Sequence, residues 1–149
     1  MKSIFDKTVR EELAYRINLL NESSQAHWGK MTVGQMLRHC CLCEEYYFGN
    51  VTIKRSLLGR IVGRRAINAI LKDEASGLIK NSPAPAIFQV HQLVANLDAE
   101  KQQWISLIER YTLFKQNEFT HWFFGRMQKE QLGQFIYKHA DHHLRQFGV

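Results

Sequence analysis

Three of the seven histidines, His139, His142 and His143, lie within five residues near the end of the chain. In a helix, His139 and His143 are one turn apart and fall in the middle of an apolar stripe. Two imidazoles with this spacing can bind one divalent metal ion through their ring nitrogens. Buried histidines can also be satisfied by hydrogen bonds alone. The segment therefore indicates either a metal site or two hydrogen-bonded core histidines.

A further histidine, His39, lies in a second predicted helix. Thr32 as the N-cap and Gln35 three residues later form a capping box, and the helix is expected to end near Tyr47. His39 falls within the broader apolar face of this helix, so its side chain can point inwards. Considered alone, a hydrogen-bonded core or boundary histidine is the simpler interpretation.

The three cysteines, Cys40, Cys41 and Cys43, lie within four residues of one another. Neighbouring residues on one helix diverge, so this grouping does not suit a disulfide framework. We expect reduced thiols packed within the helix. Cys43 is one turn after His39 and within reach of the same region.

The composition indicates one all-α domain over residues 1–149. Of the residues, 45% are hydrophobic and 23% charged, which is typical of a globular protein, and Gly and Pro are sparse. No segment has the apolar length of a signal peptide or of a membrane span. We therefore expect a cytoplasmic protein with no membrane partner.

The histidines are positioned by long segments with helical periodicity. An irregular connection covers about Asp73–Phe88, and Phe119–Gly125 forms an aromatic turn before the last helix. The predicted helices are Ser3–Leu20, Thr32–Tyr47, Lys54–Lys72, Gln89–Phe114 and a final helix from about Gln128. In the fourth of these, Leu93 is expected on the inner stripe, and the main part could instead be capped by Asp98.

The Lys54–Lys72 segment alternates basic and aliphatic residues, which predicts a basic amphipathic helix. Such a helix could meet a membrane surface or a nucleic acid. The simpler interpretation is that its apolar side packs on the rest of the bundle or across a dimer, while its bases are solvated. Nucleic-acid binding is disfavoured because no aromatic residues interleave with the bases to stack on nucleotides.

Three motifs carry a resemblance to a known family. Met31–Cys40, His121–Gly125 and Tyr137–Gly148 resemble the DinB/YfiT-like superfamily, and more narrowly a branch catalogued as a domain of unknown function. The resemblance implies a four-helix bundle with a crossover connection, often dimeric, with the basic helix as an addition between the second and third bundle helices. It further implies that His39, His139 and His143 together bind a divalent metal.

The resemblance also implies a function. Three neutral imidazoles suit zinc, nickel or iron and leave coordination positions open for water or an anionic ligand. The implied activity is a metal-dependent S-transferase or isomerase that acts on small electrophiles with a low-molecular-weight thiol. Tyr46, His142 and Arg145 are the residues expected to orient the substrate.

Two further residues belong to the aromatic turn. His121 is expected to close the end of the bundle rather than bind metal, and Trp122 stands where the family typically has Pro.

The alternative function is a non-catalytic, stress-associated bundle in which Cys43 completes a structural metal site.

Overall fold

The computed structural model describes all residues, 1–149. It contains five α-helices, two short 3₁₀ helices and one pair of strands. In chain order these are α1 (Lys7–Leu19), α2 (Val33–Tyr47), α3 (Leu57–Ile70), η1 (Ala86–Phe88), α4 (Leu97–Glu109), η2 (Arg110–Leu113), β1 (Glu118–His121), β2 (Gly125–Gln128) and α5 (Lys129–Gln146).

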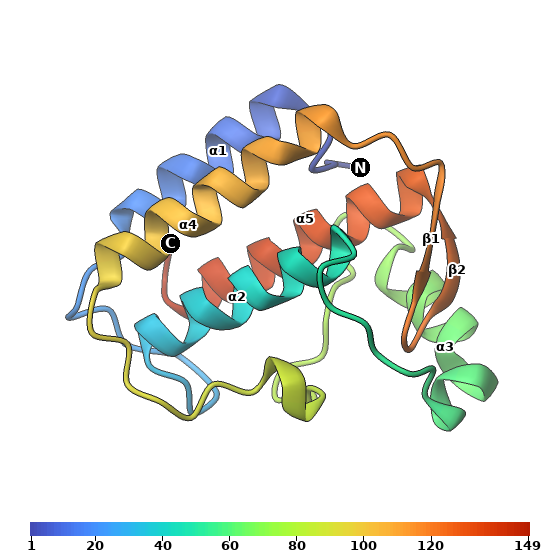
Figure 1. The fold of residues 1–149 in the computed structure, drawn as a ribbon, viewed down its shortest axis with the longest axis horizontal. Helices are drawn as coiled ribbons and strands as arrows, with labels where there is room; N and C mark the ends of the chain where they lie inside the picture. The colour runs from blue at the N-terminus through green and yellow to red at the C-terminus, as the bar shows by residue number, and fades with distance from the viewer.

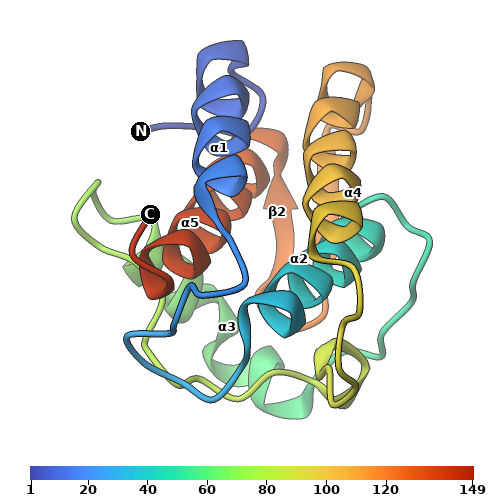
Figure 2. The same cartoon turned by 90° about the vertical axis from the view of Figure 1, so that its left-hand side faces the viewer.

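Four of the helices form two layers. Helices α1 and α4 lie side by side in one layer, and α2 and α5 form the layer beneath them (Figures 1 and 2). The core between the layers is aliphatic and aromatic, and Leu13, Met36, Trp104 and Leu132 are completely buried in it. Helical spacing of such residues gives each helix one apolar face, which the opposite layer covers.

The expectation of an all-α four-helix bundle is wrong, because the segment before α5 forms an antiparallel β-hairpin. Strand β1 pairs with β2 in a register that places His121 opposite Gly125. Gly125 has a φ of +85°, a conformation that favours glycine at the end of a tight turn. In β2, Gly125 and Met127 are buried while Arg126 and Gln128 are exposed, which is the period of two of a strand.

The capping box predicted for the second helix is confirmed. The Gln35 backbone N–H donates to Thr32 Oγ1 (3.2 Å), and the Thr32 N–H donates to Gln35 Oε1 (3.0 Å). The predicted end of this helix at Tyr47 is also confirmed. Local hydrogen bonding therefore fixes the start of the helix that carries His39.

The expected start of the fourth helix at Gln89 is wrong, whereas the alternative cap at Asp98 is two residues from the observed N-cap. Helix α4 begins at Leu97, and its N-cap is Asn96, whose Oδ1 accepts from the Ala99 N–H (2.9 Å). Leu93, expected on the inner stripe, is 87% exposed. The aliphatic residues before Asn96 belong to an irregular segment that follows η1.

Helix α3 confirms the predicted basic helix, but most of its apolar side does not pack on the rest of the chain. Its buried residues are Gly59, Gly63 and Ile67, while Leu57 and Ile61 are 77% and 78% exposed. The glycines allow the helix to approach the hairpin closely, so its aliphatic side faces away from the core. None of the helices has the length and apolarity that a bilayer span requires.

Candidate metal centre

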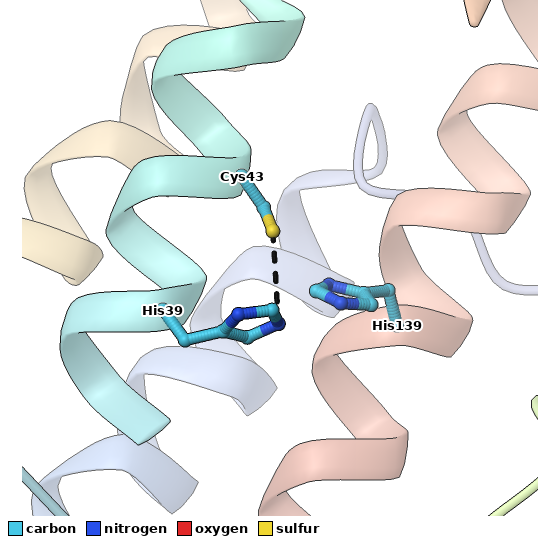
Figure 3. Close-up of side chains that lie close together, drawn as sticks. All are labelled: His39, Cys43 and His139. Carbon is cyan, nitrogen blue, oxygen red and sulfur yellow. Dashed lines mark hydrogen bonds between the residues drawn. The ribbon is translucent and has the colours of Figure 1, made fainter. Parts of the chain in front are cut away.

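Two helices present a compact group of metal-ligand atoms. His39 and Cys43 lie one turn apart on α2, and His139 faces them from α5 (Figure 3). One ligand atom from each residue lies within 4.8 Å of the other two. Within the group, Cys43 Sγ is 3.7 Å from His39 Nε2. All three side chains are buried, and nitrogen and sulfur are ligands that zinc accepts.

His143 adjoins this group from the next turn of α5. Its ring centroid is 4.9 Å from that of His39 and 4.7 Å from that of His139. The rings of His39 and His139 are 5.5 Å apart. The structure thus brings together all three histidines singled out in the sequence, with Cys43 beside His39. His143 is not a member of the compact His39–Cys43–His139 group.

Hydrogen bonds orient two of the imidazoles. His39 Nδ1 is 2.8 Å from the Phe88 carbonyl oxygen, and His143 Nδ1 is 2.9 Å from Gln146 Oε1. Both partners are acceptors, so each Nδ1 carries the proton and each Nε2 keeps its lone pair. The Gln146 amide is itself oriented, because its Nε2 donates to the Trp28 carbonyl oxygen (2.6 Å). Metal-binding histidines usually have such a second hydrogen bond.

Burial keeps the imidazoles neutral. It lowers the pKa of His39, lowers the pKa of His143 to about 3 and lowers the pKa of His139 well below its usual value. Burial also raises the pKa of the Cys43 thiol well above its usual range. The histidines therefore have free lone pairs at neutral pH, whereas Cys43 would have to release a proton to bind a metal.

His121 lies in the hairpin and has a different function in the fold. Its Nδ1 accepts hydrogen bonds from the backbone N–H groups of Phe123 and Phe124 (3.1 and 3.2 Å). Burial, with a smaller contribution from Arg55, lowers its pKa to about 3, so the ring stays neutral. His121 thus stabilises the turn of the hairpin through these two hydrogen bonds. Trp122 is part of this turn.

The three residues expected to orient a substrate do not share one surface. His142 and Arg145 line a cavity of about 340 Å³ together with Trp28, and the His142 ring is 5.2 Å from the ring of His143. Tyr46 instead accepts a hydrogen bond from the Trp122 N–H (2.7 Å). Its hydroxyl is committed to the hairpin backbone.

Sequence reasoning missed the two groups that orient the histidines. Gln146 lies three residues after His143 on the apolar stripe. An amide on a buried face needs hydrogen-bond partners, so its position could have indicated a contact with His143. The Phe88 carbonyl had no such signal, because a residue of η1, 49 positions after His39, supplies it. The importance of such a carbonyl becomes visible only in the folded chain.

The fold and this cluster define a largely helical protein with a buried imidazole and thiol group that could hold a metal ion. A family model described as "Protein of unknown function (DUF1569)" matches residues 5–148, and the chain belongs to that family. No curated protein matches the chain. No solved structure matches it either.

Proposed function

We propose that this protein binds a divalent metal ion, zinc, nickel or iron, at the cluster between α2 and α5. His39 and His139 are the two ligands common to every arrangement considered. The observation that carries the proposal is the orientation of His39, whose Nδ1–H donates to Phe88 and whose Nε2 faces Cys43 and His139. The third ligand is His143 in an enzyme and Cys43 in a structural site.

In the favoured function, His39, His139 and His143 hold the metal of an enzyme that joins a low-molecular-weight thiol to a small electrophile, or isomerises such a substrate. A divalent metal with an open position lowers the pKa of a bound thiol. In the transfer reaction the thiol releases its proton and its sulfur forms a bond to the electrophilic carbon. The bond from that carbon to the leaving group breaks, and the leaving group departs with the bonding electrons and takes up the proton. The buried imidazoles exclude water from this side of the cluster.

His142 and Arg145 are proposed to bind the substrate at the neighbouring cavity. His142 lies beside His143 and against Trp28, whose ring centroid is 5.5 Å away. Arg145 lines the same cavity and is 3.8 Å from the Asp141 carboxylate, and Lys80 and Lys138 supply further positive charges there. The arrangement suits a small molecule that carries an anionic group.

The second candidate function is a non-catalytic protein in which the metal links two helices. The proximity of Cys43 Sγ to His39 Nε2 favours it, because a thiolate would add a third ligand from the protein and partly neutralise the ion. In this case the metal contributes to folding stability and no substrate is turned over.

Elemental analysis of protein purified without added metal or chelator tests the site. We expect near-stoichiometric metal in the wild type and loss of metal in His39→Ala and His139→Ala. Retention is expected in His91→Ala, a matched control at an exposed histidine. Equal metal content in all of these proteins, or none in the wild type after incubation with each ion, would exclude the site.

Two further variants distinguish the candidate functions. If His143→Ala loses the metal and Cys43→Ser keeps it, the three-histidine arrangement is supported; the reverse result supports the structural site. The enzyme also requires turnover when thiols are combined with model electrophiles, and His139→Ala should abolish it while circular dichroism remains unchanged. Absence of turnover above a metal-free control would eliminate the transferase.

A further inference from the structure

Helix α3 exposes an aliphatic surface that no other part of the chain covers. Leu57, Leu58 and Ile61 are 77%, 61% and 78% exposed. At about 100° per residue, Leu57 and Ile61 lie within about 40° of each other, and Leu58 follows on the same side. We call these three residues the α3 aliphatic patch.

Arginines lie at one edge of the α3 aliphatic patch and within it. Helical geometry places Arg60 and Arg64 beside Leu57 at one edge, and Arg65 one turn after Ile61 at an angle between Ile61 and Leu58; all three arginines are exposed. Residues 51–72 contain six basic residues and no acidic one. The other 14 basic residues of the chain equal its 14 acidic residues in number, so the net charge of +6 resides in this segment.

The hairpin holds α3 in this orientation. A Cβ atom at Gly59 or Gly63 would overlap the carbonyl oxygen of Phe123, so the glycine side of the helix lies directly on the backbone of the turn. Ser56 N–H donates to the Trp122 carbonyl oxygen (3.0 Å), and Arg64 donates to the Arg126 carbonyl oxygen (3.2 Å). The aliphatic patch therefore points outwards because the opposite side of the helix is fixed.

We propose that α3 is a docking surface for an anionic lipid bilayer, on which the helix lies parallel to the membrane plane. The aliphatic patch would enter the boundary between headgroups and acyl chains, and the three arginines would bind lipid phosphates. This mode requires no membrane-spanning helix. It places the candidate metal centre outside the bilayer, because the hairpin packs on the glycine side of α3, opposite the aliphatic patch, and α5 contacts the hairpin in turn (Figure 1).

Two other occupants fit the surface less well. A nucleic acid would use the arginines but would leave Leu57 and Ile61 without an apolar partner. A second copy of the chain could cover the aliphatic residues, but it would bring two groups of six basic residues together without acidic partners in the same segment. An anionic bilayer satisfies both the apolar and the charged groups.

Vesicle co-sedimentation of the full chain tests the proposal. We expect binding to phosphatidylcholine vesicles that contain phosphatidylglycerol, no binding to pure phosphatidylcholine, and weaker binding as salt concentration rises. Leu57→Ser with Ile61→Ser, and separately Arg60→Gln with Arg65→Gln, should each weaken binding about tenfold or more. Leu93→Ser and Lys115→Gln are the matched controls at exposed positions outside α3, and they should bind as the wild type does.

Several results would overturn the proposal. Failure to sediment with anionic vesicles at low salt would do so, as would wild-type binding by the Leu57→Ser, Ile61→Ser variant. A dimer in gel filtration that this variant dissociates, without vesicle binding, would assign the surface to a second copy. Binding to duplex DNA that this variant retains, without vesicle binding, would assign it to a nucleic acid.

Discussion

Gln146 is the residue that connects the candidate metal centre to the loop before α2. Its Nε2 donates to the Trp28 carbonyl, which leaves Oε1 as the acceptor for His143 Nδ1. The amide therefore determines which ring nitrogen of His143 faces the cluster. A carboxylate in its place would have no N–H to donate to the Trp28 carbonyl oxygen.

We predict that Gln146→Met weakens metal binding about 10- to 100-fold if His143 is a ligand, because the His143 ring loses the partner that orients it. Metal affinity measured by competition with a chromophoric chelator checks this. Gln103→Met, at an exposed position on α4, is the control and should have wild-type affinity. Unchanged affinity in Gln146→Met would remove His143 from the ligand set.

Glu44 is a buried carboxyl group with polar partners but no counter-ion. Tyr111 Oη and Trp104 Nε1 donate to its two oxygens, the latter at 3.3 Å. Burial raises the pKa of Glu44 to about 7, and these hydrogen bonds only partly oppose the shift. The folded state thus binds this proton more tightly than the unfolded state, so the stabilisation is complete below pH 4.5 and is lost as the pH rises through 7.

We predict that Glu44→Gln gains stability relative to the wild type as the pH rises. Between pH 5.5 and 8.5 the difference in free energy of unfolding should change by about 2 kcal/mol in favour of the variant, because glutamine has no charge to bury. Urea denaturation of both proteins across this range measures it. The buried histidines have lowered pKa values and act in the opposite direction, but they are common to both proteins and cancel in the difference. A difference independent of pH would show that Glu44 ionises normally.

At the scale of elements, the contact between α3 and the hairpin depends on two residues without side chains. Gly59 and Gly63 bring the helix onto the Phe123 backbone, where a carbonyl oxygen occupies the space that a Cβ would need. Backbone cannot move aside as a flexible side chain can. The position of α3 is therefore more sensitive to the size of these residues than to their helix propensity.

We predict that Gly63→Ala lowers the free energy of unfolding by about 1–3 kcal/mol, although alanine is the better helix former. Chemical denaturation measures the change. Gly77→Ala is the matched control, since a Cβ there would meet no atom within 4 Å, and its stability should be nearly unchanged. Equal stability of Gly63→Ala and the wild type would mean that α3 can shift on the hairpin at no cost.

The sequence predicted the elements where the signal is local. The capping box of α2 uses residues three apart, and the histidine spacing on α5 depends on one helical turn, so both could be derived from neighbouring residues. The hairpin was missed because its aromatic residues, Phe119–Phe124, give no clear alternation and its stability comes from packing on α5. The orientation of α3 was missed for a similar reason: periodicity identifies an aliphatic side but does not show which side another element will cover.

At the scale of the whole molecule, the candidate metal centre joins parts that are about 100 residues apart in sequence. His39 lies in the first third of the chain and His139 in its last helix. That they face each other could not be derived from their spacing, and it was expected only through a family resemblance. The role of Cys43 beside them likewise depends on how α2 rotates towards α5.

We predict that saturating zinc raises the melting temperature by about 5–10 °C. At a concentration 100 times its dissociation constant, a ligand that binds only the folded state adds about 2.7 kcal/mol to the free energy of unfolding. For a chain of this size, each kcal/mol raises the melting temperature by about 2–4 °C. Differential scanning fluorimetry with zinc and with chelator measures the shift. His39→Ala should show none, and an equal shift in this variant would place the zinc elsewhere.

The arrangement of α2 and α5 also sets an order of events during synthesis. Helix α2 leaves the ribosome well before α5, and loop closure over such a separation is slow compared with local helix formation. Until the last helix docks, His39 and Cys43 have no opposing imidazole from α5. A nascent chain thus carries only two of the four candidate ligands, and metal loading at this cluster would mark a polypeptide in which α5 has docked against α2.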